Sequence, residues 1–563
     1  MQMFSRLILF FVLIISSQQY AKFQAPVRAK NGMVVSANEI ASKVGVEILK
    51  KGGNAIDAAV ATGFALAVTY PQAGNIGGGG FMVIHLADGK NTTIDYREKA
   101  PATAFRDMYL DSNGDFDISL STEGWGASGV PGSVYGLLYA LEKYGTMSRE
   151  EVLKPAIELA KSGFKVGYRF ARALNHYRDK FSSIPSTKKI FTKEEGVYSD
   201  DDIFIQSELA NTLIRIKENG IDGFYKGETA KLIAKQSKSN GGFISLEDLN
   251  NYKAVERNAV TGRFRENKIV SVGPPSSGGI ALVEALNALE NFAFDNDSWG
   301  SSNYIHIVSE VLKHVYADRA EHLGDEDFYP VPKKWLLSKK RGKEIADDVT
   351  EIAKPSNDIS HSKPPKKESE ETTHYSVIDA SGNAVSVTTT LNSTFGNKIV
   401  VDGAGFILNN EMDDFSAKPG TPNQFGLLGG EANSIEPNKR MLSAMTPTIV
   451  LDKENRPYLV VGSPGGSTII TTVMQILLNV IEFKMDIQEA ISQPRFHHQW
   501  KPERIDYEKY GMTNDVKNAL ISKGHFIGKQ RMLGRAEGIL VDYKNNIIWG
   551  ASDPRGYGKA VGY

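Results

Sequence analysis

The segment of residues 355–376 constrains the fold most, because a polar stretch changes within it to the alternating pattern of a strand. Residues 355–371 are polar, include proline and contain few apolar side chains, so they are expected to form an exposed loop. From His374 onward, apolar and polar residues alternate as in a strand, and residues 384–390 alternate again after a Ser-Gly-Asn turn. The sequence therefore predicts a β-hairpin that begins at a threonine, directly behind a dispensable loop.

Thr372 stands at this boundary and carries a hydroxyl. A cut between Glu371 and Thr372 would free an α-amine beside that hydroxyl, and the amine could then serve as the base that activates it. The alternative is a strand that merely starts with two threonines after a linker, since threonine is favoured in strands for structural reasons. This stretch alone leaves both interpretations open.

The N-terminus has the pattern of a secretory signal peptide. Arg6 precedes a short apolar run, residues 7–15, and a small residue follows at Ala21. The run is short for a transmembrane helix, so an N-terminal anchor is the less favoured alternative. We therefore expect residues 1–21 to be removed and the mature protein to be soluble and exported, to the periplasm or the medium.

Composition excludes several other classes of protein. The 563 residues include no cysteine, which rules out disulfides, a thiol nucleophile and a zinc–cysteine site. The net charge of −1 gives no reason to expect nucleic acid or an anionic membrane as a partner. His497 and His498 are adjacent without the i,i+4 spacing of helical metal ligands, so no metal is expected there.

The first half predicts helices that flank short strands. Asn38 is a suitable N-cap for a helix to about residue 51, and a second, apolar helix is expected at residues 55–69. Four consecutive glycines, residues 77–80, precede a strand rather than follow one. A phosphate-binding loop has the opposite order, so these glycines predict a close backbone approach or left-handed backbone angles instead of nucleotide binding.

The second half contains three segments with open interpretations. The corner at residues 274–279 exposes N–H groups and hydroxyls at a helix N-terminus, or is only a rigid turn. Residues 409–414, after an expected strand at 405–408, combine acids and amides that suit an ammonium group or a solvated turn. Residues 462–467 join a strand to a helix and offer two N–H groups to an oxyanion, or form a tight turn.

These motifs in this order resemble the γ-glutamyltransferase family over nearly the whole mature chain. The resemblance rests on residues 74–81, 95–98, 274–279, 371–376, 409–415, 440–447 and 462–467. It implies an N-terminal nucleophile hydrolase, an α+β fold with a four-layer αββα sandwich of two stacked antiparallel sheets. It also implies a large subunit, residues 22–371, and a small catalytic subunit, residues 372–563, which form a heterodimer after self-cleavage.

The resemblance also assigns roles to single residues. The catalytic group comprises the nucleophile Thr372, its supporting Thr390, and Gly465 and Gly466 of the oxyanion hole. The substrate's α-carboxylate and α-ammonium are assigned to Arg97, Asn392, Glu411, Asp414 and Ser443. A second serine of the family pattern is Ala444 here, so one hydroxyl is missing unless water or Thr446 compensates. Phe425, in an irregular loop, is similar to the lid residue of relatives that have one.

The activity implied is cleavage of the γ-glutamyl bond of glutathione and its conjugates, through an ester on Thr372. Water, an amino acid or a short peptide would accept the γ-glutamyl group, without metal or organic cofactor and without a stable membrane anchor. Two rival interpretations remain. One is a glutaryl acylase of the β-lactam type with the same fold. The other is a secreted binding protein that has lost catalysis.

Overall fold

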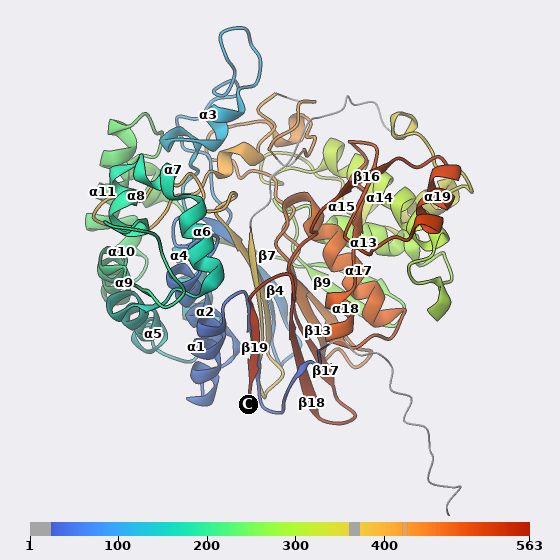
Figure 1. Ribbon diagram of the computed structural model, residues 1–563, viewed down its shortest axis with the longest axis horizontal. Coiled ribbons are helices and arrows are strands. Elements are labelled where there is room, and N and C mark those ends of the chain that lie inside the picture. Colours follow the sequence, from blue (N-terminus) through green and yellow to red (C-terminus); the bar gives the residue numbers. More distant parts are fainter. Residues whose placement is uncertain (1–23, 360–371, 419, 425) are drawn as a thin grey trace, which may run out of the picture.

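The computed structural model describes residues 24–359, 372–418, 420–424 and 426–563. Residues 1–21, Glu371 and Phe425 of the expectations above lie outside this range. Figure 1 shows two sheets side by side in the centre, with one group of helices on the left and another on the right. The predicted four-layer α+β sandwich is confirmed.

The two large sheets each contain seven strands. One sheet has the order β19 (Lys559–Gly562), β2 (Met33–Ser36), β10 (Thr373–Ile378), β11 (Ala384–Thr390), β3 (Gly79–His85), β4 (Asn91–Asp95) and β7 (Val255–Arg257). The other has the order β1 (Val27–Ala29), β18 (Ile547–Ser552), β17 (Glu537–Asp542), β13 (Pro457–Gly462), β12 (Thr448–Leu451), β9 (Asn267–Ser271) and β8 (Val260–Phe264). All neighbouring strands in both sheets are antiparallel.

The sheet that contains β10 is buried on both faces, because each strand sends alternate side chains to two cores. In β2, Met33 and Val35 join the core between the sheets, whereas Val34 joins the core under the helices. In β3, Phe81 and Val83 face the first core and Met82 faces the second. Apolar side chains on both faces fix this sheet in the middle of the sandwich.

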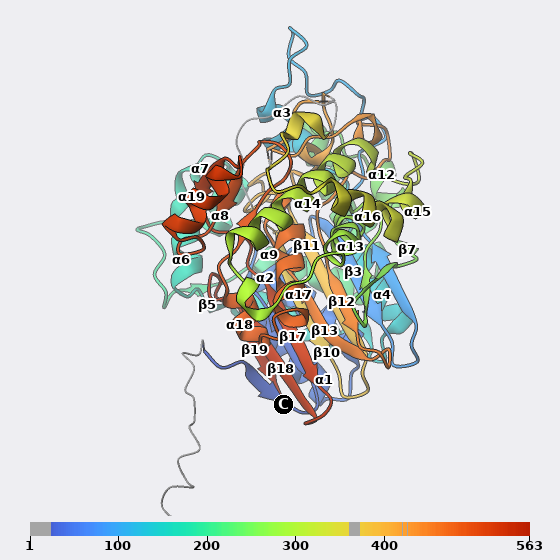
Figure 2. The ribbon, with the colours of Figure 1, turned by 90° about the vertical axis from the view of Figure 1, so that its right-hand side faces the viewer.

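Helices cover the outer face of each sheet. The β10 sheet is covered by α1 (Glu39–Lys50), α2 (Ala55–Thr69), α4 (Ser133–Tyr144), α5 (Arg149–Ser162) and α9 (Ser207–Asn219). The other sheet is covered by α13 (Gly278–Leu289), α14 (Ser302–His322), α17 (Ile469–Ile481) and α18 (Ile487–Ser492), which face the viewer in Figure 2. Within the described ranges, every helix is too short or too polar to cross a bilayer.

The remaining elements are short and lie around the sandwich. The helices are α3 (Ile118–Thr122), α6 (Tyr168–His176), α7 (Arg178–Ser182), α8 (Pro185–Phe191), α10 (Asp222–Tyr225), α11 (Gly227–Ser239), α12 (Leu246–Asn251), α15 (Lys333–Leu336), α16 (Lys339–Asp348) and α19 (Asn514–Ser522). The strands are β5 (Phe164–Lys165), β6 (Ile203–Phe204), β14 (Phe496–His497), β15 (Ile505–Tyr507) and β16 (Ile527–Gln530).

Most local predictions are confirmed, and one is wrong. Asn38 caps α1 by accepting hydrogen bonds from the N–H groups of Ile40 and Ala41. The strand expected at residues 405–408 is absent, with only a single bridge between Val400 and Ile407. The reason is Gly405, whose φ of +77° turns the chain against α9 instead of extending it.

Candidate active site

The β10–β11 hairpin brings two threonine hydroxyls to one end of the central sheet. Its register pairs Thr373 with Thr389, so the next residues outward, Thr372 and Thr390, lie opposite each other. Side chains alternate along a strand, so Thr372 lies on the same face as His374, which packs against Gly462 of the second sheet. The threonine pair therefore points toward the turn that follows β13.

The four consecutive glycines make the close approach that their sequence predicts. A Cβ at Gly78 would lie 2.1 Å from the carbonyl oxygen of Thr390, and one at Gly77 would lie 2.1 Å from that of Ile407. A Cβ at Gly80 would lie 2.4 Å from the carbonyl oxygen of Thr388. Only glycine lets this segment pass so close to β11, and its packing fixes the backbone of Thr390.

One cavity collects nearly all the predicted site residues. Its wall includes Arg97, Thr372, Thr390, Asn392, Glu411, Asp414, Ser443, Ala444 and Gly466. Leu427, Met445 and Ile469 complete the wall with apolar surface. Sequence reasoning missed these three, because apolar residues carry no local signal that separates a cavity wall from a core.

Arg97 is the electrostatic centre of the cavity. Its guanidinium is fully buried and donates hydrogen bonds to the carboxylates of Glu411 and Asp414, and to the carbonyl oxygen of Met441. Burial alone lowers the pKa of Arg97, but these carboxylates and Glu98 raise it above its ordinary value. Residues that the resemblance assigned to opposite charges of one substrate thus contact each other directly.

Asn392 lies at the end of β11 with a positive φ of 74°. Its backbone N–H donates to the Thr390 hydroxyl at 2.7 Å, and its side-chain amide donates to the carbonyl oxygen of Asn410. This residue therefore connects the threonine pair to the acidic 3₁₀ turn Glu411–Asp414.

The turn after β13 places Gly466 in the cavity wall, opposite the end of the hairpin. Gly465 has φ of +137° and Gly466 has φ of +51°, and the 3₁₀ turn Gly466–Thr468 leads directly into α17. The predicted oxyanion hole therefore has one of its two glycines, Gly466, in the cavity wall. Gly465 lies beside this wall rather than in it.

The corner at residues 274–279 has a structural role. The hydroxyls of Ser276 and Ser277 donate to the carbonyl oxygens of Met445 and Ser443, each at 2.6 Å. These bonds hold Ser443 and Ala444 in the wall. The hydroxyl of Thr446 donates to the Ala444 carbonyl at 2.9 Å, so it does not replace the missing serine hydroxyl.

The irregular loop that contains Phe425 reaches the cavity from the other side. Asn423 donates its side-chain amide to Asp414 at 3.1 Å, and the Ser393 hydroxyl donates to the side-chain carbonyl of Gln424 at 2.9 Å. Leu427 contributes to the wall. The described part of this loop therefore borders the charged end of the cavity.

Comparison with known proteins identifies the family. The family model described as gamma-glutamyltranspeptidase matches residues 41–563. The chain belongs to this family. It is 50% identical over 532 residues to the glutathione hydrolase proenzyme of Escherichia coli (strain K12), covering 94% of this chain and 91% of the relative.

Two solved structures agree with the fold of the gamma-glutamyltranspeptidase family. The Helicobacter pylori gamma-glutamyltranspeptidase has 44% identity and a TM-score of 0.57, covering 61% of this chain and 96% of its own. The cephalosporin acylase from Bacillus halodurans has 25% identity and a TM-score of 0.85, covering 97% of this chain and 98% of its own. A gamma-glutamyltranspeptidase and a cephalosporin acylase therefore share this architecture.

Glu98 is a further residue beside the family site that sequence reasoning left without a role. It follows Arg97 directly, and its carboxylate lies 3.5 Å from the Arg97 guanidinium. Its side chain is fully buried behind Arg97 and does not line the cavity. Its position next to Arg97 was the only sequence signal.

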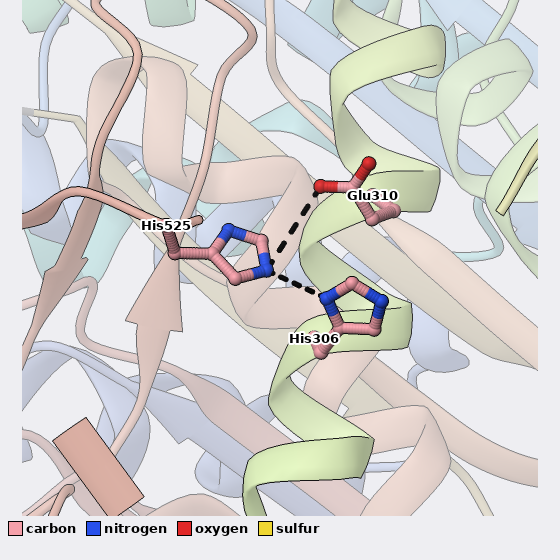
Figure 3. Close-up of side chains that lie close together, drawn as sticks. All are labelled: His306, Glu310 and His525. Atoms are coloured by element: carbon pink, nitrogen blue, oxygen red, sulfur yellow. Dashed lines mark hydrogen bonds and ion pairs between the residues drawn. The ribbon is translucent and has the colours of Figure 1, made fainter. Parts of the chain in front are cut away.

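A histidine cluster elsewhere in this gamma-glutamyltranspeptidase family member has the composition of a metal site. Figure 3 shows His306 and Glu310 on α14 facing His525. Nε2 of His306 donates to the Thr350 carbonyl, so its Nδ1 accepts from His525 at 2.7 Å. Lys313 lies 2.8 Å from Glu310. Both ring nitrogens of His306 are already hydrogen-bonded, and the Lys313 ammonium lies beside the Glu310 carboxylate. These contacts fit a structural cluster better than a cation site.

His497 and His498 are likewise engaged with protein groups. His497 shares hydrogen bonds with the Thr471 hydroxyl at 2.9 Å and the Gln499 side chain at 2.8 Å. His498 accepts a hydrogen bond from the backbone N–H of Trp500 at 3.1 Å. Both side chains are buried, and burial lowers the pKa of His497 to about 4.

Proposed function

We propose that this protein is a self-processing γ-glutamyl hydrolase and transferase that acts on glutathione and its conjugates. The observation that carries the proposal is the placement of Thr372 in one buried cavity with Arg97, Glu411 and Asp414. The cationic Arg97 and the acidic Glu411 and Asp414 suit the α-carboxylate and α-ammonium of an amino acid. Thr372, in the same cavity, suits attack on a carbonyl in the side chain of that amino acid.

Maturation comes first in this proposal. The Thr372 hydroxyl attacks the carbonyl of Glu371, which gives an ester in place of the peptide bond, and water then hydrolyses the ester. The products are a large subunit, residues 22–371, and a small subunit, residues 372–563, with a free α-amine on Thr372. An unperturbed α-amine has a pKa near ~8, so a neutral base is available at mildly alkaline pH.

The reaction on the donor repeats this chemistry. The Thr372 hydroxyl attacks the γ-amide carbonyl, the α-amine takes the hydroxyl proton, and the N–H groups of Gly465 and Gly466 stabilise the oxyanion. The amine then returns the proton to the leaving nitrogen and a γ-glutamyl ester remains. Water or the amino group of an amino acid or peptide opens the ester. Thr390 supports the nucleophile through its hydroxyl.

The γ-glutamyl donor and the glutaryl substrate of the acylase alternative differ in the charged groups on the α-carbon. Arg97 and Ser443 bind the α-carboxylate, while Asn392, Glu411 and Asp414 surround the α-ammonium. A glutaryl group has no α-ammonium, so Arg97 would remain the only cation that contacts Glu411 and Asp414 in the described part of the cavity. The likeness to a cephalosporin acylase keeps this alternative in view, and the 50% identity to a glutathione hydrolase proenzyme favours the γ-glutamyl donor.

The test compares two anilides that differ only in the α-ammonium group. The purified protein should hydrolyse γ-glutamyl anilide much faster than glutaryl anilide under the same conditions. Equal rates, or a faster rate on the glutaryl compound, would favour the acylase. Hydrolysis of neither by a cleaved, folded protein would favour the secreted binding protein.

The leaving group and the acceptor have space on the other side of Thr372. A wider groove also includes Thr372 in its wall, together with Arg169, Arg172, Arg555 and Tyr557. Its cationic side chains suit the free carboxylate of a dipeptide or amino acid. Adding an amino acid acceptor during glutathione cleavage should yield γ-glutamyl-acceptor product. Export to the periplasm or the medium completes the proposal, with the signal peptide at residues 1–21.

A further inference from the structure

Glu98 is a buried acid whose oxygens have no ordinary hydrogen-bond donors. Its side chain is fully buried, and neither carboxyl oxygen has a hydrogen-bond partner within the described part of the chain. Buried carboxylates are normally paired or hydrogen-bonded, because an unsatisfied charge in a protein interior is costly. Nη1 of Arg97, at 3.5 Å, is its nearest ion-pair partner.

Glycines make the space for this carboxyl group. A Cβ at Gly79 would lie 2.5 Å from Oε2 of Glu98, and a Cβ at Gly129 would lie 3.1 Å from its Cβ. Any larger residue at Gly79 would therefore collide with the acid. The chain thus leaves room at two positions for this acidic side chain.

Glu411 is the second acid at the same guanidinium nitrogen. Nη1 of Arg97 contacts Oε1 of Glu411 on one side and Oε2 of Glu98 on the other. Glu411 is within hydrogen-bonding reach of both Glu98 and Asp414. Asp414 already accepts from Arg97 and Asn423, whereas Oε2 of Glu411 and both oxygens of Glu98 have no donor among the described side chains. Two carboxylates so placed repel each other, whereas one acid and one carboxylate share a hydrogen bond.

The charge balance of the cavity requires such a proton. Arg97 and Arg319, which interacts with Asp414, carry two positive charges, while Glu98, Glu411 and Asp414 would carry three negative charges if all were ionised. One negative charge would then be left without a cation. Among the described residues, the phenols of Tyr96, Tyr225 and Tyr252 also face Glu98, and burial raises the pKa of each, so they are neutral. Burial raises the pKa of Glu98 to about 7, against the attraction of Arg97, and burial also raises the pKa of Glu411.

We propose that Glu98 is a positioning residue that shares one proton with Glu411 and thereby leaves Arg97 available to the donor's α-carboxylate. The proton belongs to the pair rather than to either acid. In this form the Glu98 acid donates to Oε2 of Glu411, and the two oxygens of Glu411 are held by Glu98 and Arg97. This inference rests on the proposed γ-glutamyl function of the cavity.

The shared proton makes donor binding depend on pH. When the pair loses its proton, the Glu98 carboxylate pairs with Arg97 from behind and adds a negative charge near the α-carboxylate of the donor. Both effects oppose binding of that carboxylate. Binding should therefore weaken as pH rises through neutrality, separately from the titration of the Thr372 amine, which controls the chemical step.

The experiment measures binding of L-glutamate, which carries the same α-groups as the donor, to the mature enzyme by competitive inhibition. For the wild type, the inhibition constant should rise roughly tenfold or more between about pH 6.5 and about pH 8.5. Glu98→Gln keeps a hydrogen-bond donor but has no titratable proton, so its inhibition constant should change less than about twofold over the same range.

Asp413→Asn is the matched control. Asp413 is also buried, with its pKa raised to about 7 by burial, but its carboxylate accepts from Ser121 and Gln424 and makes no ion pair with Arg97. This variant should keep the wild-type pH dependence. A Glu98→Gln enzyme with the wild-type pH dependence, or an Asp413→Asn enzyme without it, would overturn the role of Glu98.

Infrared difference spectra provide a second readout that does not depend on catalysis. Two protonated-carboxyl contributions should disappear across this pH range in the wild type, one from Asp413 and one from the Glu98 pair. Glu98→Gln should lose the second contribution and keep the first, whereas Asp413→Asn should do the reverse. If Glu98→Gln fails to fold, Glu98→Asp should still titrate but with a displaced band, and an unchanged band would overturn the proposal. A folded, cleaved wild type that ignores γ-glutamyl donors would contradict the proposed function instead.

Discussion

Arg97 holds the polar groups of the cavity together, since its guanidinium donates hydrogen bonds to two carboxylates and two backbone carbonyls. Arg97→Ala would leave those acids without their cation and remove the partner of the donor's α-carboxylate. We expect kcat/KM for a γ-glutamyl anilide to fall by an amount equivalent to roughly 2–5 kcal/mol. Arg97→Lys should recover only part, because an ammonium cannot form the same fork. Unchanged kcat/KM would remove Arg97 from the site.

Ala444 is the residue at which this chain departs from the family pattern. It lies in the cavity wall beside Ser443, and the nearby Thr446 hydroxyl is already donated to a backbone carbonyl. Ala444→Ser should add a hydrogen bond to the α-carboxylate and lower KM by roughly tenfold, equivalent to about 1.4 kcal/mol.

This gain should affect the ground state and the transition state alike, so kcat should change little. Rates are to be measured with one donor and no acceptor, and single-turnover kinetics would show whether KM follows binding. A KM that is unchanged or higher in the serine variant would mean that this position does not contact the carboxylate.

At the scale of residues, the sequence named several side chains that the fold brings together. A local pattern singled out Thr372 and the family resemblance added Arg97 and Glu411, and all three line one cavity. Their roles stay predictions. Glu98 had no assignment, because its meaning depends on burial and on two acids meeting at one nitrogen. Leu427 was missed because only the folded loop brings it to the wall.

At the scale of elements, the glycine segment before β3 determines where Thr390 lies. In Gly78→Ala the new methyl group would lie 2.1 Å from the Thr390 carbonyl oxygen, so β11 must shift. Small displacements of catalytic groups are costly, and we expect kcat to fall by roughly 10²-fold. Gly126→Ala is the control, because its methyl group would meet nothing closer than 3.4 Å.

The slower formation of two fragments by Gly78→Ala on a denaturing gel would show the same displacement in the precursor. Equal kcat and equal cleavage rates for the two alanine variants would mean that this contact does not position Thr390.

Elements with strong periodicity were predictable, and those that depend on contacts were not. The hairpin of β10 and β11 and the helices α1, α2 and α17 follow their sequence patterns closely. Residues 405–408 are as apolar as a strand, but Gly405 turns them against α9. Periodicity shows which face of a segment is apolar, but it does not show which neighbouring element packs against that face.

At the scale of the whole molecule, the two expected subunits share both sheets. Strands β10 and β11 of the small subunit lie between β2 and β3 of the large subunit. In the other sheet, β1 and β9 of the large subunit flank four strands of the small one. Neither piece can leave without breaking strand pairs on two edges and exposing the core between the sheets.

The cleaved protein should therefore remain a tight heterodimer. We expect both fragments to elute together in size-exclusion chromatography under native conditions and to separate only in denaturant, in the same transition that removes the secondary structure. Separation of the fragments in native buffer, with each fragment still folded, would contradict the shared-sheet arrangement.

The central claim is that Thr372 cuts the chain before itself and then serves as the γ-glutamyl nucleophile. Intact-mass measurement of the purified wild type and of Thr372→Ala, with a γ-glutamyl anilide assay on the same samples, tests it most directly. The account predicts two fragments for the wild type, the smaller beginning at residue 372, with activity, and one uncut, inactive chain for Thr372→Ala. A Thr372→Ala sample that still yields the small fragment from residue 372, or an uncut wild type that hydrolyses the anilide, would contradict it.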